Sequence, residues 1–278
     1  MCSYIIDDMH KHTLLIITVI YKNYSILTDL FTSLSSQKEL FHMVIVDLSP
    51  KPEPIAPPSF PITILTSSNL GYAHGVNIGL QFGLSHNYTY YCVINSDTFV
   101  QKDFVRQVVH SIELHPKSII GGKIYYAPGY EYHTQRYTEK DKGKVLWYAG
   151  GTFDWSHALT PHRGVDEVDT GQFDLPELTG FINGCLMCFD KTVINTVGLW
   201  SEAYFMYFED ADFCARAKQK NVSLWYNPLI VMWHKNAQST GGSGSSSHVE
   251  FQKKSRLRFG LKYAPLRTKI HLLKLLFT

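Results

Sequence analysis

The sequence contains no apolar stretch that approaches the roughly 18 residues needed to cross a bilayer. Its N-terminus places Asp7, Asp8 and Lys11 before the first apolar run, which is not the pattern of a secretory signal peptide. Cysteine is scarce, with five irregularly spaced residues among 278. An odd, irregular set of cysteines favours free thiols in a reducing compartment. These absences predict a cytoplasmic protein without structural disulfides.

Acidic residues are missing from the C-terminal tail. All 24 aspartates and glutamates precede Phe251, whereas eight of the 26 lysines and arginines follow it. Residues 1–250 therefore carry a formal charge of −6, and residues 251–278 carry +8. An acidic body argues against a nucleic-acid-binding protein, and a basic tail favours contact with an anionic surface.

The basic tail also has helical periodicity. Residues 248–263 and 266–277 predict two basic amphipathic helices. The second repeats four apolar residues on one face: Leu266, Ile270, Leu273 and Phe277. Such a helix suits the surface of an anionic membrane and would place the protein on the inner face of the cell membrane. The alternative is that the apolar face packs against the protein body.

Short apolar runs alternate with helical patterns over the first 125 residues. Strands are predicted at five places: 14–20, 43–46, 62–65, 90–94 and 119–124. Helices are predicted between them, at 26–34, 76–84 and 104–112. This alternation predicts an α/β fold with a mostly parallel central sheet flanked by helices. Ligands bind beyond the carboxyl ends of such strands, which is where Asp47 and Asp97 stand.

The rest of the body is less regular. Residues 125–180 are weakly periodic and rich in glycine, tyrosine and histidine, which suggests a segment that carries specificity. Residues 178–189 have strand character, and we expect Cys185 and Cys188 to be buried thiols on opposite faces of that strand. Further elements are predicted in this order: a helix between Asp190 and Gly198, a helix at 209–220, and strands at 222–226 and 229–233.

The segment Asn95-Ser96-Asp97 follows one of the predicted buried strands. A carboxylate at the open end of a strand, with a second oxygen ligand two residues earlier, makes a good site for Mg²⁺ or Mn²⁺. The alternative is that Asp97 caps the helix that starts near Gln101.

Three acids open the predicted helix at 209–220. Glu209, Asp210 and Asp212 suit a helix N-terminus, where negative charge complements the dipole. However, an aromatic run at 204–208 precedes them and would place the carboxylates at the edge of an apolar wall. Such surroundings raise carboxyl pKa values and suit a general base.

Two further signals lie near the end of the body. His234 ends a predicted strand, where a histidine is either structural or functional. The segment 239–243, Ser-Thr-Gly-Gly-Ser, could cradle phosphate with its backbone N–H groups and hydroxyls, or serve as a linker.

The order of these segments resembles glycosyltransferase family 2, and specifically its bacterial rhamnosyltransferase-like branch. The resemblance covers residues 13–262 and is carried mainly by three segments: Asn69–Gly79, Tyr204–Arg216 and Trp233–Gly242. The segment 148–151, Tyr-Ala-Gly-Gly, also looks like the central part of this branch.

The resemblance implies a GT-A type fold. A nucleotide-sugar-binding half would span residues 13–125, and an acceptor-binding and catalytic half would span residues 126–247. Basic amphipathic helices would follow at 248–278.

The resemblance also implies roles for individual residues. Asp210 matches the catalytic base, and Glu209 beside it would raise the pKa of that base by charge repulsion. Asp97, Asn95 and His234 match the metal site. Four groups of residues would bind the donor. Asp47 would contact the base or ribose, and Asn69, Gly71 and Asn77 would line the nucleotide pocket. Asn95 and Ser96 would lie near the metal, and Ser239 and Thr240 would approach the diphosphate.

Two positions depart from the family pattern. Leu48 follows Asp47 where asparagine is usual, and Asn95 replaces an aspartate, which leaves one charge fewer for a metal.

The implied activity is an inverting, metal-dependent transfer of a sugar from a nucleotide diphosphate to an acceptor hydroxyl. The branch suggests dTDP-rhamnose as donor first and UDP-hexoses next, with a glycan or lipid-linked glycan as acceptor. The process would be synthesis of a bacterial surface polysaccharide such as O-antigen or capsule. Two rival functions are a sugar-nucleotide pyrophosphorylase and a non-catalytic carbohydrate-binding protein of transferase descent. A pyrophosphorylase needs a glycine-rich basic loop after the first strand, where this chain has Tyr21-Lys22-Asn23-Tyr24.

Overall fold

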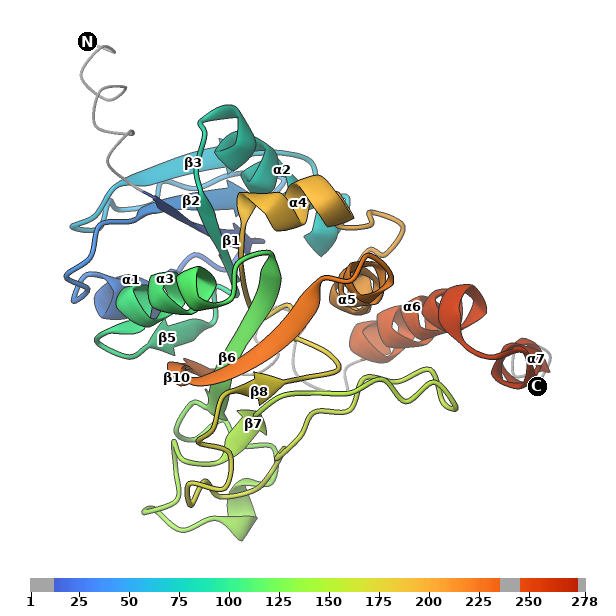
Figure 1. Ribbon diagram of the computed structural model, residues 1–278. Helices are drawn as coiled ribbons and strands as arrows, with labels where there is room; N and C mark the ends of the chain where they lie inside the picture. The colour runs from blue at the N-terminus through green and yellow to red at the C-terminus, as the bar shows by residue number, and fades with distance from the viewer. Residues whose placement is uncertain (1–12, 236–245, 275–278) are drawn as a thin grey trace.

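The computed structural model describes residues 13–235 and 246–274, whose strands form one mixed sheet (Figure 1). The strand order is β3-β2-β1-β4-β9-β6-β10-β5, with β7 beside β6 and β8 beside β10. The first four strands in this order pair in parallel: β3 Ile62–Thr66, β2 His42–Asp47, β1 Leu14–Ile20 and β4 Tyr90–Ile94. The predicted α/β fold with a largely parallel sheet flanked by helices is confirmed.

One strand joins the two halves of the sheet. The remaining strands are β5 Thr98–Val100, β6 Ser118–Tyr126, β7 Leu146–Tyr148, β8 Glu177–Leu178, β9 Leu186–Asp190 and β10 Ser223–His234. Strand β9 runs antiparallel between β4 and β6, and β10 runs parallel to β6. The sequence predicts two strands in this region, but the structure has the single strand β10. Its pairing with β6 shifts register between Asn227 and Val231.

Helices pack against this sheet. Their bounds are α1 Leu27–Leu34, α2 Tyr72–Ser85, α3 Phe104–Leu114, α4 Lys191–Val197 and α5 Glu209–Gln219, with a short 3₁₀ turn at Thr134–Arg136. Helix α2 lies very close to β1, since a Cβ on Gly79 would stand 2.4 Å from Cγ2 of Ile17. Glycine in the first turn lowers helix propensity, which is why the sequence predicts this helix only from Val76 onward.

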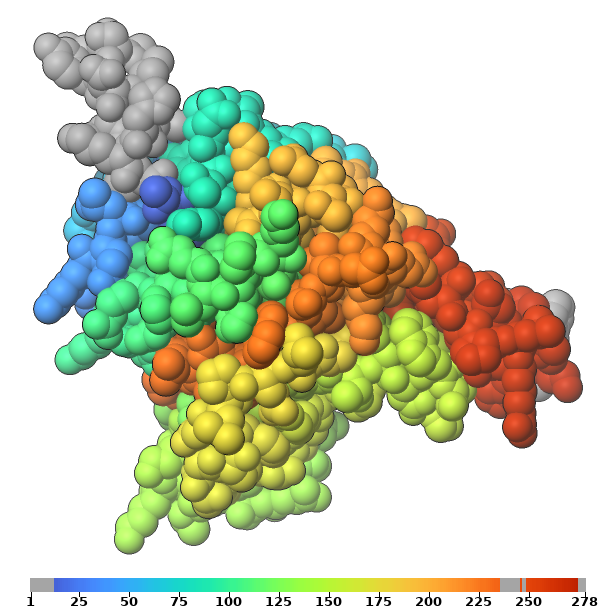
Figure 2. Space-filling view, in the orientation of Figure 1, coloured from blue at the N-terminus to red at the C-terminus, as the bar shows by residue number. Residues whose placement is uncertain are grey.

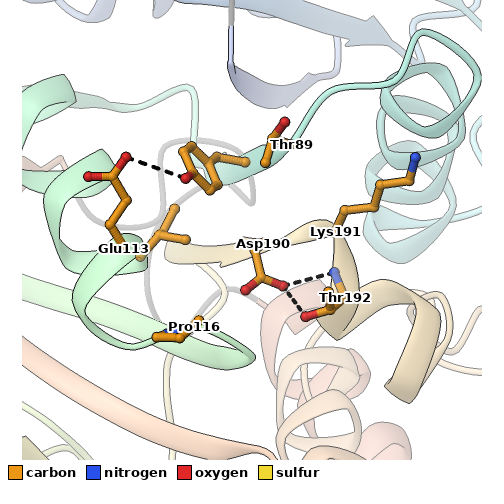
Figure 3. Close-up of a pocket in the computed structure, with 8 residues that line it drawn as sticks. Thr89, Glu113, Pro116, Asp190, Lys191 and Thr192 are labelled. Atoms are coloured by element: carbon orange, nitrogen blue, oxygen red, sulfur yellow. Dashed lines mark hydrogen bonds between the residues drawn. The ribbon is translucent and has the colours of Figure 1, made fainter.

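For residues 178–198, one expectation from the sequence is wrong and one is confirmed. The stretch 178–189 is not one strand, because residues 179–185 form a loop before β9. By contrast, the predicted cap of α4 is confirmed, because Asp190 accepts hydrogen bonds from the N–H groups of Thr192 and Val193. Figure 3 shows the contact between Asp190 and Thr192. A surface cavity of about 320 Å³ lies beside this cap.

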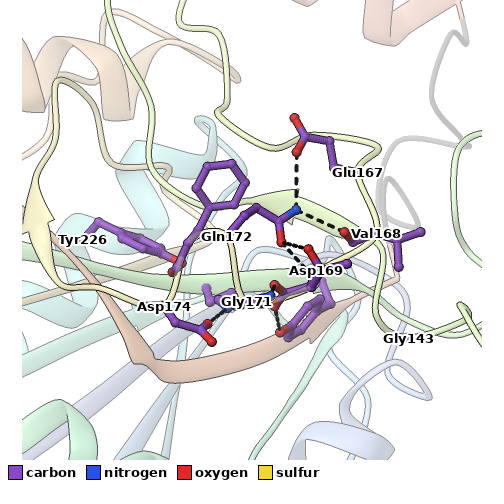
Figure 4. A network of polar contacts seen from close by, with 12 residues as sticks. Gly143, Glu167, Val168, Asp169, Gly171, Gln172, Asp174 and Tyr226 are labelled. Carbon is purple, nitrogen blue, oxygen red and sulfur yellow. Dashed lines mark hydrogen bonds and ion pairs between the residues drawn. The ribbon is translucent and has the colours of Figure 1, made fainter.

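The middle segment is held to the sheet by buried charge. Lys123 of β6 is buried and forms ion pairs with Asp169, at 2.7 Å, and with Asp174. Figure 4 shows these two carboxylates beside the turn at Gly171. Arg163 from the same segment lies over the ring of Tyr226 in β10. These contacts stabilise a stretch with little regular structure.

The chain ends in two further helices, α6 Ser246–Tyr263 and α7 Leu266–Lys274, close to the expected bounds. They lie together at one side of the molecule (Figure 1), beside the yellow-green middle segment (Figure 2). Arg256 donates to the carbonyl oxygen of His157, and Thr268 donates to that of Ser156. No helix in the described residues is long and apolar enough to span a membrane.

Candidate active site

A cavity of about 760 Å³ opens at the carboxyl ends of the parallel strands. Ile20 at the end of β1, Leu48 after β2 and Asn95 after β4 all line it, as expected for a ligand crevice. Seven residues predicted from the sequence lie on its wall: Asn69, Asn95, Ser96, Asp97, Glu209, Asp210 and His234. Residues from sequence positions far apart are therefore brought to one place.

Asp97 and His234 face each other on this wall. Strand β10 pairs antiparallel with β5 so that His234 stands opposite Thr98, and this register brings its ring to Asp97. His234 Nε2 lies 3.2 Å from Asp97 Oδ1, and both residues are buried, with exposures of 4% and 2%. Burial opposes protonation of His234, but the charges of Asp97 and Cys185 outweigh it and raise its pKa well above the ordinary value. The alternative role of Asp97 as a helix cap is wrong, since α3 begins only at Phe104.

This pair fits a divalent cation. A carboxylate oxygen and an imidazole nitrogen are suitable ligands for Mn²⁺, and Mg²⁺ is commonly held by one or two carboxylates plus phosphate oxygens. Among the described residues no three histidine, cysteine, aspartate or glutamate side chains converge as a complete metal cluster. A cation at Asp97 and His234 would therefore need oxygens from the substrate.

Asn95 is tied into the protein beside this pair. Its Oδ1 accepts a hydrogen bond from the Tyr72 hydroxyl at 2.9 Å, and its Nδ2 lies 3.1 Å from Cys185 Sγ. Cys185 in turn lies 4.0 Å from His234 Nε2. The argument that Cys185 lies on a strand face is wrong, because it precedes β9 and lines the cavity. The described cysteines are free and buried, as predicted: Cys92, Cys185, Cys188 and Cys214.

Asp210 is held rigidly at the start of α5. Its Oδ2 accepts from the Gly184 N–H at 2.8 Å, and its Oδ1 accepts from the Ala211 N–H at 2.7 Å. Burial raises the pKa of Asp210 to about 6, although these two N–H groups favour the ionised form. An ionised, oriented carboxylate in an apolar cavity is suited to accept a proton near neutral pH.

Glu209 behaves differently from its neighbour. Burial first, and then the charge of Asp210, raise the pKa of Glu209 well above its ordinary value. Its Oε2 is buried without a hydrogen-bond partner among the described residues. Burial is the main cause of the raised pKa of both carboxyl groups, and the repulsion between their charges adds to it on Glu209.

The backbone before α5 is strained. Tyr207 and Phe208 both have positive φ, at 67° and 66°, a region that side-chain-bearing residues adopt at a cost of about 1–3 kcal/mol each. The two residues line the cavity, and the turn they make directs Glu209 and Asp210 toward it. Strain of this kind persists only where the surroundings enforce it.

Several predicted donor residues have other partners. Asp47 does not line the cavity; its carboxylate accepts from the Tyr24 hydroxyl at 2.6 Å and from the Ser49 N–H at 2.8 Å. Asn77 also does not line it, because its amide binds the backbone of Trp200 and the Glu202 carboxylate.

Gly71 lies outside the cavity wall as well. A Cβ there would stand 2.4 Å from the carbonyl oxygen of Phe205, so the glycine is required for close backbone contact. Asn69 is on the wall, and its Oδ1 accepts from the Gly71 N–H. Ser239 and Thr240 lie outside the described residues.

Other residues on the wall were not predicted from the sequence. Trp147 packs edge-on against the His234 ring, with centroids 4.7 Å apart. His162 lies 3.1 Å from the Trp147 carbonyl oxygen through Nδ1 and 3.1 Å from the Asn183 amide through Nε2. Burial lowers the pKa of His162 to about 4, so it is neutral and orients Asn183. The nearest sequence feature that pointed to this part of the wall was the segment 148–151, which resembles the central part of the family branch.

The glycosyl transferase family 2 model matches residues 15–163, more than half of the chain. The chain belongs to glycosyl transferase family 2. Within this family, the low-salt glycan biosynthesis hexosyltransferase Agl10 of Haloferax volcanii is 26% identical over 170 residues, which cover 61% of this chain and 50% of Agl10.

The fold is similar to that of solved GT-A structures. The crystal structure of GalNAc-T7 with UDP, GalNAc and Mn²⁺ has a TM-score of 0.65 at 13% identity, and the match covers 94% of this chain and 49% of that one. The chain thus spans about half the length of both relatives.

The raised pKa of Asp210 predicts a pH dependence if this residue is the general base, as the resemblance implies. A general base must be ionised, so kcat should rise with pH through about 6, the pKa of Asp210, and level off above it. The pKa of Glu209 is also raised, so Glu209→Gln is the control that separates its titration from that of Asp210. Measurement of kcat between about pH 4.5 and 8 checks this, and a rate that is independent of pH there would contradict it.

Proposed function

We propose that this chain is an inverting, metal-dependent hexosyltransferase that moves a sugar from a nucleotide diphosphate to an acceptor hydroxyl. The observation that supports this best is the placement of Asp97, His234 and Asp210 on the wall of one cavity. The donor would contact residues of the segment 13–125, and the acceptor those of 126–247. The alternative of a non-catalytic binding protein leaves the buried, oriented carboxylate of Asp210 without a role.

The donor we propose is a UDP-hexose. Agl10 is named a hexosyltransferase, and GalNAc-T7 was solved with UDP and Mn²⁺, which supports this choice. The motif resemblance to the rhamnosyltransferase-like branch keeps dTDP-rhamnose as the second candidate. The acceptor would be a glycan or lipid-linked glycan, in synthesis of a surface polysaccharide such as O-antigen or capsule.

The proposed mechanism is one in-line displacement at the anomeric carbon. Asp97 and His234 would hold Mn²⁺ or Mg²⁺, which when bound supplies positive charge to the departing diphosphate. Asp210 accepts the proton of the acceptor hydroxyl, whose oxygen forms the new glycosidic bond as the bond to diphosphate breaks. The raised pKa of Glu209 favours its protonated form, which can donate a hydrogen bond to a sugar oxygen. The N–H groups of Gly184 and Ala211 keep Asp210 oriented throughout.

The first test of this mechanism concerns the metal. EDTA should abolish transfer and Mn²⁺ or Mg²⁺ should restore it, because the diphosphate needs charge compensation. Mn²⁺ binding in the presence of UDP, followed by electron paramagnetic resonance, should be lost in Asp97→Ala. Asp103→Ala removes a carboxylate outside the cavity, and it should bind Mn²⁺ as the wild type does. Full activity in EDTA would show the metal assignment to be wrong.

The second test separates the two adjacent acids. Asp210→Asn keeps the shape but removes the basic lone pair, and kcat should fall about 10²–10⁴-fold with donor affinity nearly unchanged. Glu209→Gln is the matched control, because glutamine mimics the protonated acid that the cavity already favours; its kcat should fall less than about tenfold. A dead Glu209→Gln beside an active Asp210→Asn would exchange the two roles.

We also propose that the chain binds the inner face of the cell membrane through α7. Leu272 packs closely on Gly260 of α6, so only part of the apolar face docks on the body. Three large apolar side chains of the helix stay exposed: Leu266 at 73%, Ile270 at 48% and Leu273 at 43%. Arg267 and Lys274 accompany them, a combination suited to an anionic lipid surface. Phe277 lies outside the described residues.

Liposome sedimentation tests this surface. The full chain should sediment with anionic liposomes at low salt and be released near about 0.5 M salt, where screening is strong. A double variant, Ile270→Ser with Leu273→Ser, should stay in solution while transfer to a soluble acceptor is unchanged. Leu40→Ser with Leu114→Ser removes exposed leucines elsewhere and should sediment normally. A full chain that ignores anionic liposomes would overturn the proposal.

A further inference from the structure

Part of the cavity wall comes from three segments outside the first 125 residues. These contribute Leu159 and Thr160 from the middle segment, Met206 and Tyr207 from the turn before α5, and Val249 and Gln252 from α6. The C-terminal helix is therefore part of the wall of the active-site cavity. Most of these side chains are apolar, and Thr160 and Gln252 are polar without charge.

The position of α6 against this wall is set by packing and hydrogen bonds. Ser255 is buried and donates to the Met206 carbonyl oxygen at 2.8 Å. One helical turn to either side, Phe251 stacks on Phe205 with centroids 5.0 Å apart, and Phe259 lies 5.4 Å from Phe208. Val249 and Gln252 are thereby held beside the turn that leads into Asp210.

No lysine or arginine lines this cavity in the described residues. Asp97, Glu209 and Asp210 all line it, and Asp97 faces its partner His234. The other polar side chains that line it in the described residues are amides, hydroxyls, one thiol and the neutral imidazole of His162. A negatively charged acceptor would stand near Asp210 and find no lysine or arginine among these lining residues, and the imidazole of His234 is already paired with Asp97. Placing an unpaired charge in such a cavity is costly.

On the basis of the proposed transferase function, we propose that Val249, Gln252 and the wall around them form an acceptor subsite that selects an uncharged sugar. The amide of Gln252 and the hydroxyl of Thr160 hydrogen-bond to sugar hydroxyls. Val249, Leu159 and Met206 pack on the apolar face of the ring or on the group attached to it. Acidic sugars such as uronic acids are rejected at the same place by the carboxylates.

Binding of matched glycosides tests this subsite. Hexyl β-glucoside and hexyl β-glucuronide differ at C6 by a hydroxymethyl or a carboxylate, and the corresponding galactose pair differs in the same way. Each is titrated into the full chain with UDP and Mn²⁺ present, and followed by ligand-observed NMR. We expect at least one neutral glycoside to bind, and its acidic partner to bind at least about tenfold more weakly.

A charge placed on the wall should change this preference. Gln252→Lys should narrow the ratio of neutral to acidic affinity by about fivefold, as one partly exposed ion pair allows. Leu261→Lys adds the same charge on the same helix outside the cavity wall and should leave the ratio unchanged.

The outcomes are separable. Equal binding of neutral and acidic glycosides, or binding of neither, overturns the acceptor subsite when UDP still binds. An unchanged ratio in Gln252→Lys removes Gln252 from the subsite. Failure of both UDP and dTDP to bind the wild-type chain with Mn²⁺ would instead overturn the proposed function itself.

Discussion

Three carboxyl groups lie on the wall of one cavity, and each is stabilised there in a different way. Asp97 is compensated by the imidazole of His234 at 3.2 Å. Asp210 keeps its charge because two backbone N–H groups point at its oxygens. Glu209 has no such partner on Oε2, and burial together with the charge of Asp210 favours its protonated form. Environment thus gives three side chains of the same chemistry different electrostatic properties, which suits the three different roles proposed for them.

A fourth acid, Asp212, lies on the same helix as Glu209 and Asp210 but is surrounded by positively charged and hydroxyl side chains. It is fully buried and accepts hydrogen bonds from Arg216 at 2.7 Å, Lys262 at 2.6 Å and Tyr263 at 2.8 Å. Burial alone would raise the pKa of Asp212, but these partners lower it. Because Lys262 and Tyr263 belong to α6, this cluster fastens the C-terminal helix to α5. Two residues apart, Asp210 serves the cavity and Asp212 holds the wall around it.

Sequence patterns predicted the buried strands well and the irregular parts poorly. Strands β1 and β4 match the expected ranges residue for residue, because a parallel strand covered on both faces is a continuous apolar run. The start of α2 was missed because Gly75 and Gly79 are required for close packing on β1 and weaken the helical signal. Residues 179–185 were taken as strand, since an apolar loop beneath a cavity has the same composition.

The site shows the same division between local and long-range information. Asp97, Asp210 and His234 stand at element ends, and element ends can be predicted from local patterns. Gln252 reaches the wall only through the packing of α6, which no local pattern describes.

Asn77 is a residue that a local pattern singled out but that does not reach the cavity wall. It lies in a motif segment, yet its amide is used to bind Trp200. Periodicity likewise identified an apolar face on α7 but not its neighbour. Leu272 meets the body, while Ile270 and Leu273 are left for a second surface. A pattern therefore indicates which side chains avoid water, and only the tertiary structure shows what they meet instead.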